Sequence, residues 1–84
     1  MKLVRKKIIV QGIVQGVGFR PFIYNLAESF NINGFVSNTS QGVIIEAESE
    51  LSIIDSFIDD INAKSPPLAV ITNVNSTEIK VQNS

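Results

Sequence analysis

The stretch Val14-Gln15-Gly16-Val17-Gly18-Phe19-Arg20-Pro21-Phe22, VQGVGFRPF, decides how the first part of the chain folds. Residues 8–14, which lead into it, are β-branched and mostly apolar, as is typical of a buried strand. Pro21 suits the first turn of a helix, where its missing N–H costs nothing. Apolar residues then recur at the spacing of one helical face, at Phe19, Phe22, Ile23, Leu26, Ala27 and Phe30. The stretch is therefore predicted to be a strand-to-helix connection.

The rest of the chain supplies a hairpin, a second helix and a last strand. The first helix is expected to end near residues 31–34, because Asn and Gly tolerate a left-handed backbone. Residues 35–38 and 43–48 are predicted strands, and the polar residues between them, 39–42, have turn chemistry. The last strand is expected to begin with residues 68–74, and residues after Asn75 could extend it or form a loose end.

The second helix is predicted between the hairpin and the prolines at positions 66 and 67. Ser49 is expected to be its N-cap. Its inner face is expected to consist of Leu51, Ile54, Phe57, Ile58 and Ile61. Asp55, Asp59 and Asp60 are expected on the side of this helix that faces water. The order strand, helix, strand, strand, helix, strand then predicts an α+β, ferredoxin-like (βαββαβ) sandwich, with two helices on one face of an antiparallel four-stranded sheet.

Length and composition bound the possible functions. The chain of 84 residues suits a single domain spanning residues 1–84. Seven basic and eight acidic side chains give a net charge of −1, which argues against a nucleic acid or an acidic membrane as partner. The absence of Cys and His excludes disulfides, Cys- or His-dependent nucleophilic catalysis and the commonest metal ligands, and we expect neither a cofactor nor a metal. No signal peptide or apolar run of about 20 residues is present, so a cytoplasmic protein is expected.

The predicted topology brings the glycine loop close to a residue from the hairpin. The first and second strands run parallel with the third between them, so their carboxyl ends emerge at one edge of the sheet, about 10 Å apart. The first of these strands ends at the loop and the second ends at Asn38. The first helix also begins at this edge, so its N-terminus faces the same space.

Each part of this edge has a use in binding an anion. Gly16 and Gly18 allow a positive φ, which lets successive N–H groups point inward. The helix N-terminus adds unpaired N–H groups and the positive end of the helix dipole. Arg20 can hold two phosphate oxygens at once, and Asn38 can hold a water at the phosphorus. The expected catalytic residues are Arg20 and Asn38, and the expected phosphate-binding residues are Gln15, Gly16, Val17, Gly18, Phe19 and Arg20.

Each feature also has a purely structural interpretation. Glycine pairs after a strand often form only a tight turn, an isolated Arg is often a solvated surface residue, and Asn38 is an ordinary turn residue. A cation at a helix N-terminus is nevertheless unfavourable unless an anion lies there, which favours a function for Arg20. Neither a Walker loop nor a dinucleotide fingerprint is present. Glu46 and Glu48 share one face of a strand without a third ligand, so we expect solvated side chains rather than a metal site.

Two blocks of the sequence resemble the acylphosphatase family. They are GIVQGVGFR (residues 12–20) and NGFVSNTSQGVIIEAE (residues 33–48). Arg20 and Asn38 match the two residues that this family uses, including their separation along the chain. The resemblance implies that the loop and the arginine bind phosphate and that the asparagine orients the attacking water. It implies hydrolysis of an acyl phosphate to a carboxylate and inorganic phosphate, without metal or cofactor.

Two further stretches narrow the resemblance to one subgroup. GFRPFIYNLA (residues 18–27) and SPPLAVITNV (residues 65–74) are similar to the N-terminal acylphosphatase-like domain of HypF-type carbamoyltransferases, which mature nickel–iron hydrogenases. This implies carbamoyl phosphate as the small-molecule substrate and downstream domains of the same polypeptide as partners. The chain would then be an excised first domain or a stand-alone relative. The alternative is a non-catalytic domain for carbamoyl-phosphate docking or protein interaction.

Overall fold

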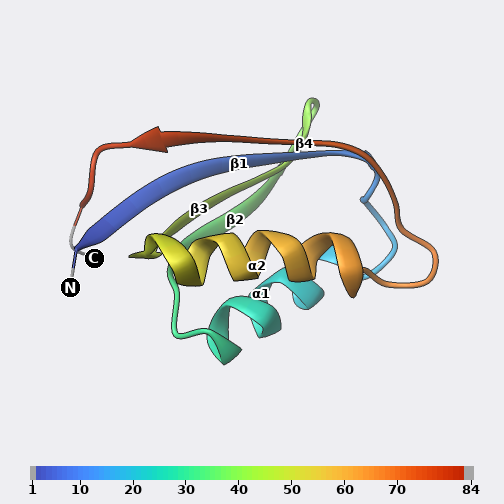
Figure 1. Cartoon of the computed structure of the whole chain (residues 1–84). Coiled ribbons are helices and arrows are strands. Elements are labelled where there is room, and N and C mark those ends of the chain that lie inside the picture. The colour runs from blue at the N-terminus through green and yellow to red at the C-terminus, as the bar shows by residue number, and fades with distance from the viewer. Residues whose placement is uncertain (1, 83–84) are drawn as a thin grey trace.

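The computed structural model describes residues 2–82 as one sheet covered by two helices. The elements in chain order are β1 (Leu3–Ile13), α1 (Phe19–Ser29), β2 (Asn33–Thr39), β3 (Gly42–Glu50), α2 (Leu51–Ala63) and β4 (Val70–Ile79). The strand order is β2-β3-β1-β4, and each neighbouring pair is antiparallel. Both helices lie on the same face of the sheet (Figure 1). The predicted ferredoxin-like sandwich is thereby confirmed, including the position of β3 between the parallel strands β1 and β2.

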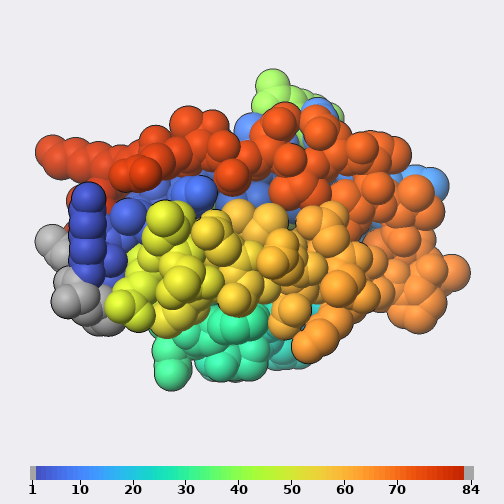
Figure 2. All heavy atoms as spheres, viewed as in Figure 1, coloured from blue at the N-terminus to red at the C-terminus, as the bar shows by residue number. Residues whose placement is uncertain are grey.

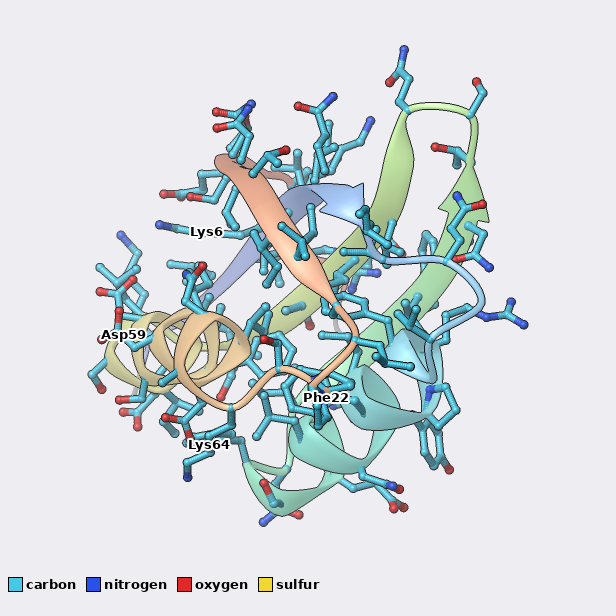
Figure 3. The ribbon with its side chains drawn as sticks, turned by 90° about the vertical axis from the view of Figure 1, so that its right-hand side faces the viewer. Lys6, Phe22, Asp59 and Lys64 are labelled. Atoms are coloured by element: carbon cyan, nitrogen blue, oxygen red, sulfur yellow. The ribbon has the colours of Figure 1, made fainter. Side chains whose placement is uncertain are left out.

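The core lies between the sheet and the helices. Every second residue of β1 and β3 points toward the helices, and Ile8, Val10, Val43 and Ala47 are wholly shielded from solvent. The helices contribute the buried residues Phe19, Ile23, Ile54, Phe57 and Ile61. Phe22 packs against this core, whereas Asp59 and Lys64 lie on the outer side of α2 (Figure 3). The predicted apolar face of α1 is therefore confirmed.

The space-filling view shows how the layers close over this core. The side chains of α2 fill the middle of the face, α1 lies beside it and β4 runs along the edge of the sheet (Figure 2). In the described part of the chain, no helix is long and apolar enough to cross a bilayer.

The bounds of β1 and β4 differ from the sequence-based expectation. β4 begins at Val70 instead of residue 68, and the residues after Asn75 extend the strand. β1 begins at Leu3 instead of residue 8, because Arg5, Lys6 and Lys7 pair with Glu48, Ala47 and Glu46 across the ladder. β4 runs to Ile79, since its far half pairs with the same charged part of β1, with Arg5 opposite Ile79. A run of cations lacks the apolar pattern of a strand, and only the partner strands show that it belongs to one.

Two expectations for α2 are wrong. Ser49 is not its N-cap, because β3 continues through Glu50 and Ser49 pairs with Val4 across the sheet. The N-cap is Glu50, whose side chain makes no capping hydrogen bond. Leu51 is not part of the inner face, since it is 47% exposed at the first position of the helix.

The expectation of solvated Glu46 and Glu48 side chains is also wrong. Arg5, which is 2% exposed, donates from Nε to Glu46 Oε1 at 2.9 Å and from Nη1 to Glu48 Oε1 at 3.1 Å. Glu48 also accepts the main-chain N–H of Gln82 at 2.8 Å. These acids therefore form a structural cluster with Arg5, located on the face of the sheet away from the helices and covered by the segment after β4.

Candidate active site at the loop between β1 and α1

The loop adopts the backbone conformation that its glycines predict. Gly16 has φ 74° and Gly18 has φ 78°, both in the left-handed region. A Cβ added at either position would meet nothing within 4 Å, so the backbone conformation and not a close contact favours glycine there. Gly18 is the N-cap of α1, and it offers no side-chain capping bond. The N–H groups of the first helical turn are therefore without a capping side chain.

A hollow of about 180 Å³ lies in front of this loop, and it brings Arg20 and Asn38 together. Asn38 comes from the end of β2, where it pairs with the buried Val43 and so lies on the helix side of the sheet. The other walls are Val14, Gln15, Gly16, Gly18, Phe19, Arg20 and Pro21. The predicted meeting of the loop, the helix N-terminus and Asn38 is thus present in the fold.

Three of the residues expected to bind phosphate differ in which of their groups a ligand could contact. Val17 does not line the hollow, and its side chain packs against the core. Phe19 is 1% exposed, with its ring 5.6 Å from that of Phe22, so only its main chain is available for a ligand. The side-chain amide of Gln15 donates from Nε2 to the main-chain oxygen of Thr39 at 2.9 Å. Sequence reasoning missed this role of Thr39, because only the fold brings the two segments together.

The hollow has a positive electrostatic character. The first turn of α1 contains no acidic residue, so the helix dipole is not neutralised locally. Among residues 2–82, no carboxylate forms an ion pair with Arg20, which is exposed at the second position of the helix. A guanidinium and a helix N-terminus together favour a dianion such as a phosphoryl group.

A larger hollow of about 340 Å³ lies between α1 and β2, away from Arg20 and Asn38. Its walls are mainly apolar, and the charged side chain that lines it is the acid Glu28; Glu46 also lines it, but the Glu46 carboxylate is bonded to Arg5 on the opposite face of the sheet. Its size alone would favour this hollow as the binding site, but no Lys or Arg lines it, so it has no cation to bind an anion. The chemistry of the side chains therefore favours the smaller hollow as the candidate site.

No three acidic side chains within residues 2–82 gather closely enough to form a candidate metal site. The polar side chains that line the smaller hollow are one cation, Arg20, and two neutral amides, Gln15 and Asn38, beside the main chain of the loop. Such groups can bind an anion, stabilise charge and orient a water molecule.

A sequence profile described as acylphosphatase matches residues 6–84, which is nearly the whole chain. The chain belongs to the acylphosphatase family. Its relatives include the acylphosphatase of Thermotoga petrophila, which is 47% identical over 73 residues that cover 86% of this chain and 80% of that enzyme. The acylphosphatase of Bacillus subtilis has a similar crystal structure, with a TM-score of 0.87, 34% identity and coverage of 94% of this chain and 88% of that one.

The family also includes domains of much larger proteins that resemble this chain. The probable carbamoyltransferase HypF of Methanocaldococcus jannaschii is 46% identical over 74 residues, which cover 88% of this chain and 10% of that protein. A crystal structure of full-length HypF in the phosphate- and nucleotide-bound form matches 96% of this chain and 11% of that one, with a TM-score of 0.93 and 42% identity. The chain thus spans about a tenth of the length of the carbamoyltransferases it matches.

Proposed function

We propose that this acylphosphatase-family chain hydrolyses acyl phosphates in the hollow between the β1–α1 loop and Asn38. The observation that carries the proposal is the convergence of Arg20, Asn38 and the left-handed glycine loop on one hollow, although β3 separates the strands that supply them. The acylphosphatase relatives that this chain covers almost completely support the same activity.

In the proposed reaction, the phosphoryl group lies against the loop N–H groups and the Arg20 guanidinium. The side chain of Asn38 holds a water in line with the bond that breaks. The water oxygen bonds to phosphorus as the bond between phosphorus and the acyl oxygen breaks, and the bonding electrons leave with the carboxylate. Both water protons remain with the phosphate, so the products are a carboxylate and dihydrogen phosphate.

This chemistry suits a site without histidine. A carboxylate is a good leaving group, so it needs no strong general acid. Phosphoryl transfer depends mainly on positioning and on electrostatic stabilisation of the transferring group. Arg20, the loop and the N-terminus of α1 supply the stabilisation, and Asn38 supplies the positioning.

For the natural substrate we propose carbamoyl phosphate, with a role in hydrogenase maturation as in the HypF proteins. The support is the similarity to HypF over most of this chain. A non-catalytic role as a docking or interaction domain is the competing function. It is favoured by the exposed apolar side chains of Ile13 and Val70, which are paired across the sheet at the end of β1 near the loop.

Phosphate release from benzoyl phosphate and carbamoyl phosphate tests these functions. We expect turnover of both substrates, with a higher kcat/KM for carbamoyl phosphate. If the protein turned over benzoyl phosphate but not carbamoyl phosphate, acyl phosphate hydrolysis would stand, and carbamoyl phosphate would be rejected as the natural substrate. Saturable binding of carbamoyl phosphate without phosphate release would reject the enzyme and favour docking, and the absence of both would favour an interaction domain.

A further inference from the structure

One hydrogen bond joins the loop after β1 to the turn beside Asn38. Gln15 Nε2 donates to the main-chain oxygen of Thr39 at 2.9 Å, and Thr39 directly follows Asn38 in the chain. The strands that precede these two segments are not neighbours, because β3 lies between β1 and β2. No ladder hydrogen bond joins the two walls of the hollow directly, whereas the Gln15 side chain spans them.

The turn at the far end of this bond is held as a unit. Thr39 Oγ1 donates to the main-chain oxygen of Gly42 at 3.1 Å and accepts the N–H of Gln41 at 3.1 Å. These local bonds fix the shape of the turn that follows Asn38. They do not fix the position of the turn relative to the loop after β1. The bond from Gln15 connects these two segments directly.

The loop is attached to the core by packing, because Val14 is buried and Val17 packs against the core, but it has few main-chain hydrogen bonds. Apart from bonds within helices and strands, residues 14–18 take part in one main-chain hydrogen bond in the described part of the chain. Phe22 N donates to Gly18 O at 3.3 Å. The left-handed glycines give the loop its shape, and a Cβ added at either of them would meet nothing within 4 Å. The bond from Gln15 adds to this packing a direct link between the loop and the turn beside Asn38.

We propose that Gln15 is a positioning residue, which sets the separation between the phosphate-binding loop and Asn38. The inference rests on the proposed function, because it takes Asn38 to orient the water. Gln15 acts through its bond to Thr39, so its side chain need not touch the substrate. A small displacement of Asn38 would misalign the water while leaving Arg20 and the loop able to hold phosphate.

Steady-state kinetics of Gln15→Met on benzoyl phosphate tests this inference. Met has a similar length but no N–H to donate. We expect kcat to fall about 3- to 10-fold, as for the loss of one neutral hydrogen bond, with the Kd for inorganic phosphate unchanged. Gln11→Met is the matched control, because the Gln11 amide bonds to Asn73 at 3.1 Å outside the hollow. An unchanged kcat for Gln15→Met, or an equal loss in kcat and in phosphate affinity, overturns the inference.

A second measurement is independent of turnover. In ¹H–¹⁵N spectra taken with and without inorganic phosphate, the side-chain amide signals of Asn38 should shift or broaden in Gln15→Met and not in Gln11→Met. If the wild-type protein hydrolyses no acyl phosphate, the proposed function fails, while these spectra still report whether Gln15 positions Asn38. Unchanged Asn38 signals in Gln15→Met would show that it does not.

Discussion

At the scale of single residues, Arg20 and Asn38 are expected to make separable contributions. Arg20 is an exposed cation at the beginning of α1, where the helix dipole by itself disfavours positive charge. An anion in the hollow would remove that conflict and bond to the guanidinium in both substrate and product. Asn38 is neutral and lies on the opposite wall, at the end of β2. It adds little to the charge that holds phosphate, so its contribution should appear in the chemical step.

The substitution Arg20→Ala should abolish measurable binding of inorganic phosphate. The reason is the loss of a charge-assisted, bidentate contact to the anion. Isothermal titration calorimetry measures the affinity, and kcat/KM should fall by about 10²–10³. Lys2→Ala is a suitable control, since Lys2 is also an exposed cation but precedes β1 at the other end of the strand. Equal phosphate affinity in the wild type and Arg20→Ala would sink the assignment.

The substitution Asn38→Ala should leave phosphate affinity within about twofold and lower kcat by about 10²–10³, as for the loss of one oriented polar group at a reaction centre. The physical reason is that water would no longer be held in line with the leaving carboxylate. Parallel calorimetry and phosphate-release assays separate the two effects. A variant that loses binding and turnover together would place Asn38 among the phosphate ligands instead.

At the scale of elements, the boundary between β3 and α2 is decided by strand pairing and not by capping. Ser49 has the side chain of an N-cap, but the ladder to β1 continues through this position. α2 begins after Glu50 without a capping side chain and is held by its packed face, in which Ile54, Phe57 and Ile61 are completely buried. Most of the stability of such a helix comes from tertiary packing, so a missing cap is tolerated.

The substitution Ser49→Ala should therefore change the free energy of unfolding by less than about 0.5 kcal/mol, because Ser49 does not cap α2. A Ser that capped α2 would contribute about 1 kcal/mol. Urea denaturation followed by circular dichroism measures the difference. Phe57→Ala is the contrasting variant, and its loss of about 3–5 kcal/mol reflects the cavity left under α2. A loss near 1 kcal/mol for Ser49→Ala would restore the capping role.

At the scale of the whole molecule, the cluster of Arg5, Glu46 and Glu48 joins three segments that are distant in sequence. Arg5 lies on β1, the acids lie on β3, and Glu48 also accepts the N–H of Gln82 after β4. Burial lowers the pKa of Arg5, but hydrogen bonds and charge attraction from Glu46 and Glu48 outweigh it, so its pKa is raised overall. A raised pKa keeps the group charged, so its stabilising contribution persists through neutral pH and is lost only in strong alkali, as the pH rises through the folded pKa.

The substitution Arg5→Met should lower the free energy of unfolding by about 3–5 kcal/mol at neutral pH, because it leaves the buried carboxylate of Glu48 without its cation. The double variant Arg5→Met/Glu48→Met should recover part of this loss, since an apolar pair can replace a buried ion pair. Lys6→Met is the control, because Lys6 and Asp55 approach only to 4.0 Å near the surface. Its cost should stay within about 1 kcal/mol. Additive losses in the double variant would exclude coupling between Arg5 and Glu48.

The sequence by itself determined the element order, the apolar face of α1 and the positive φ of Gly16 and Gly18, because these depend on local periodicity and backbone sterics. It also predicted that Arg20 and Asn38 would meet, since the strand order follows from the succession of elements. Only the tertiary structure decided what depends on neighbours across the sheet. Ladder pairing placed residues 3–7 and 75–79 in strands, and burial enclosed Glu48 with Arg5. The fold also brought the loop after β1 next to the end of β2, so that the Gln15 side chain bonds to Thr39.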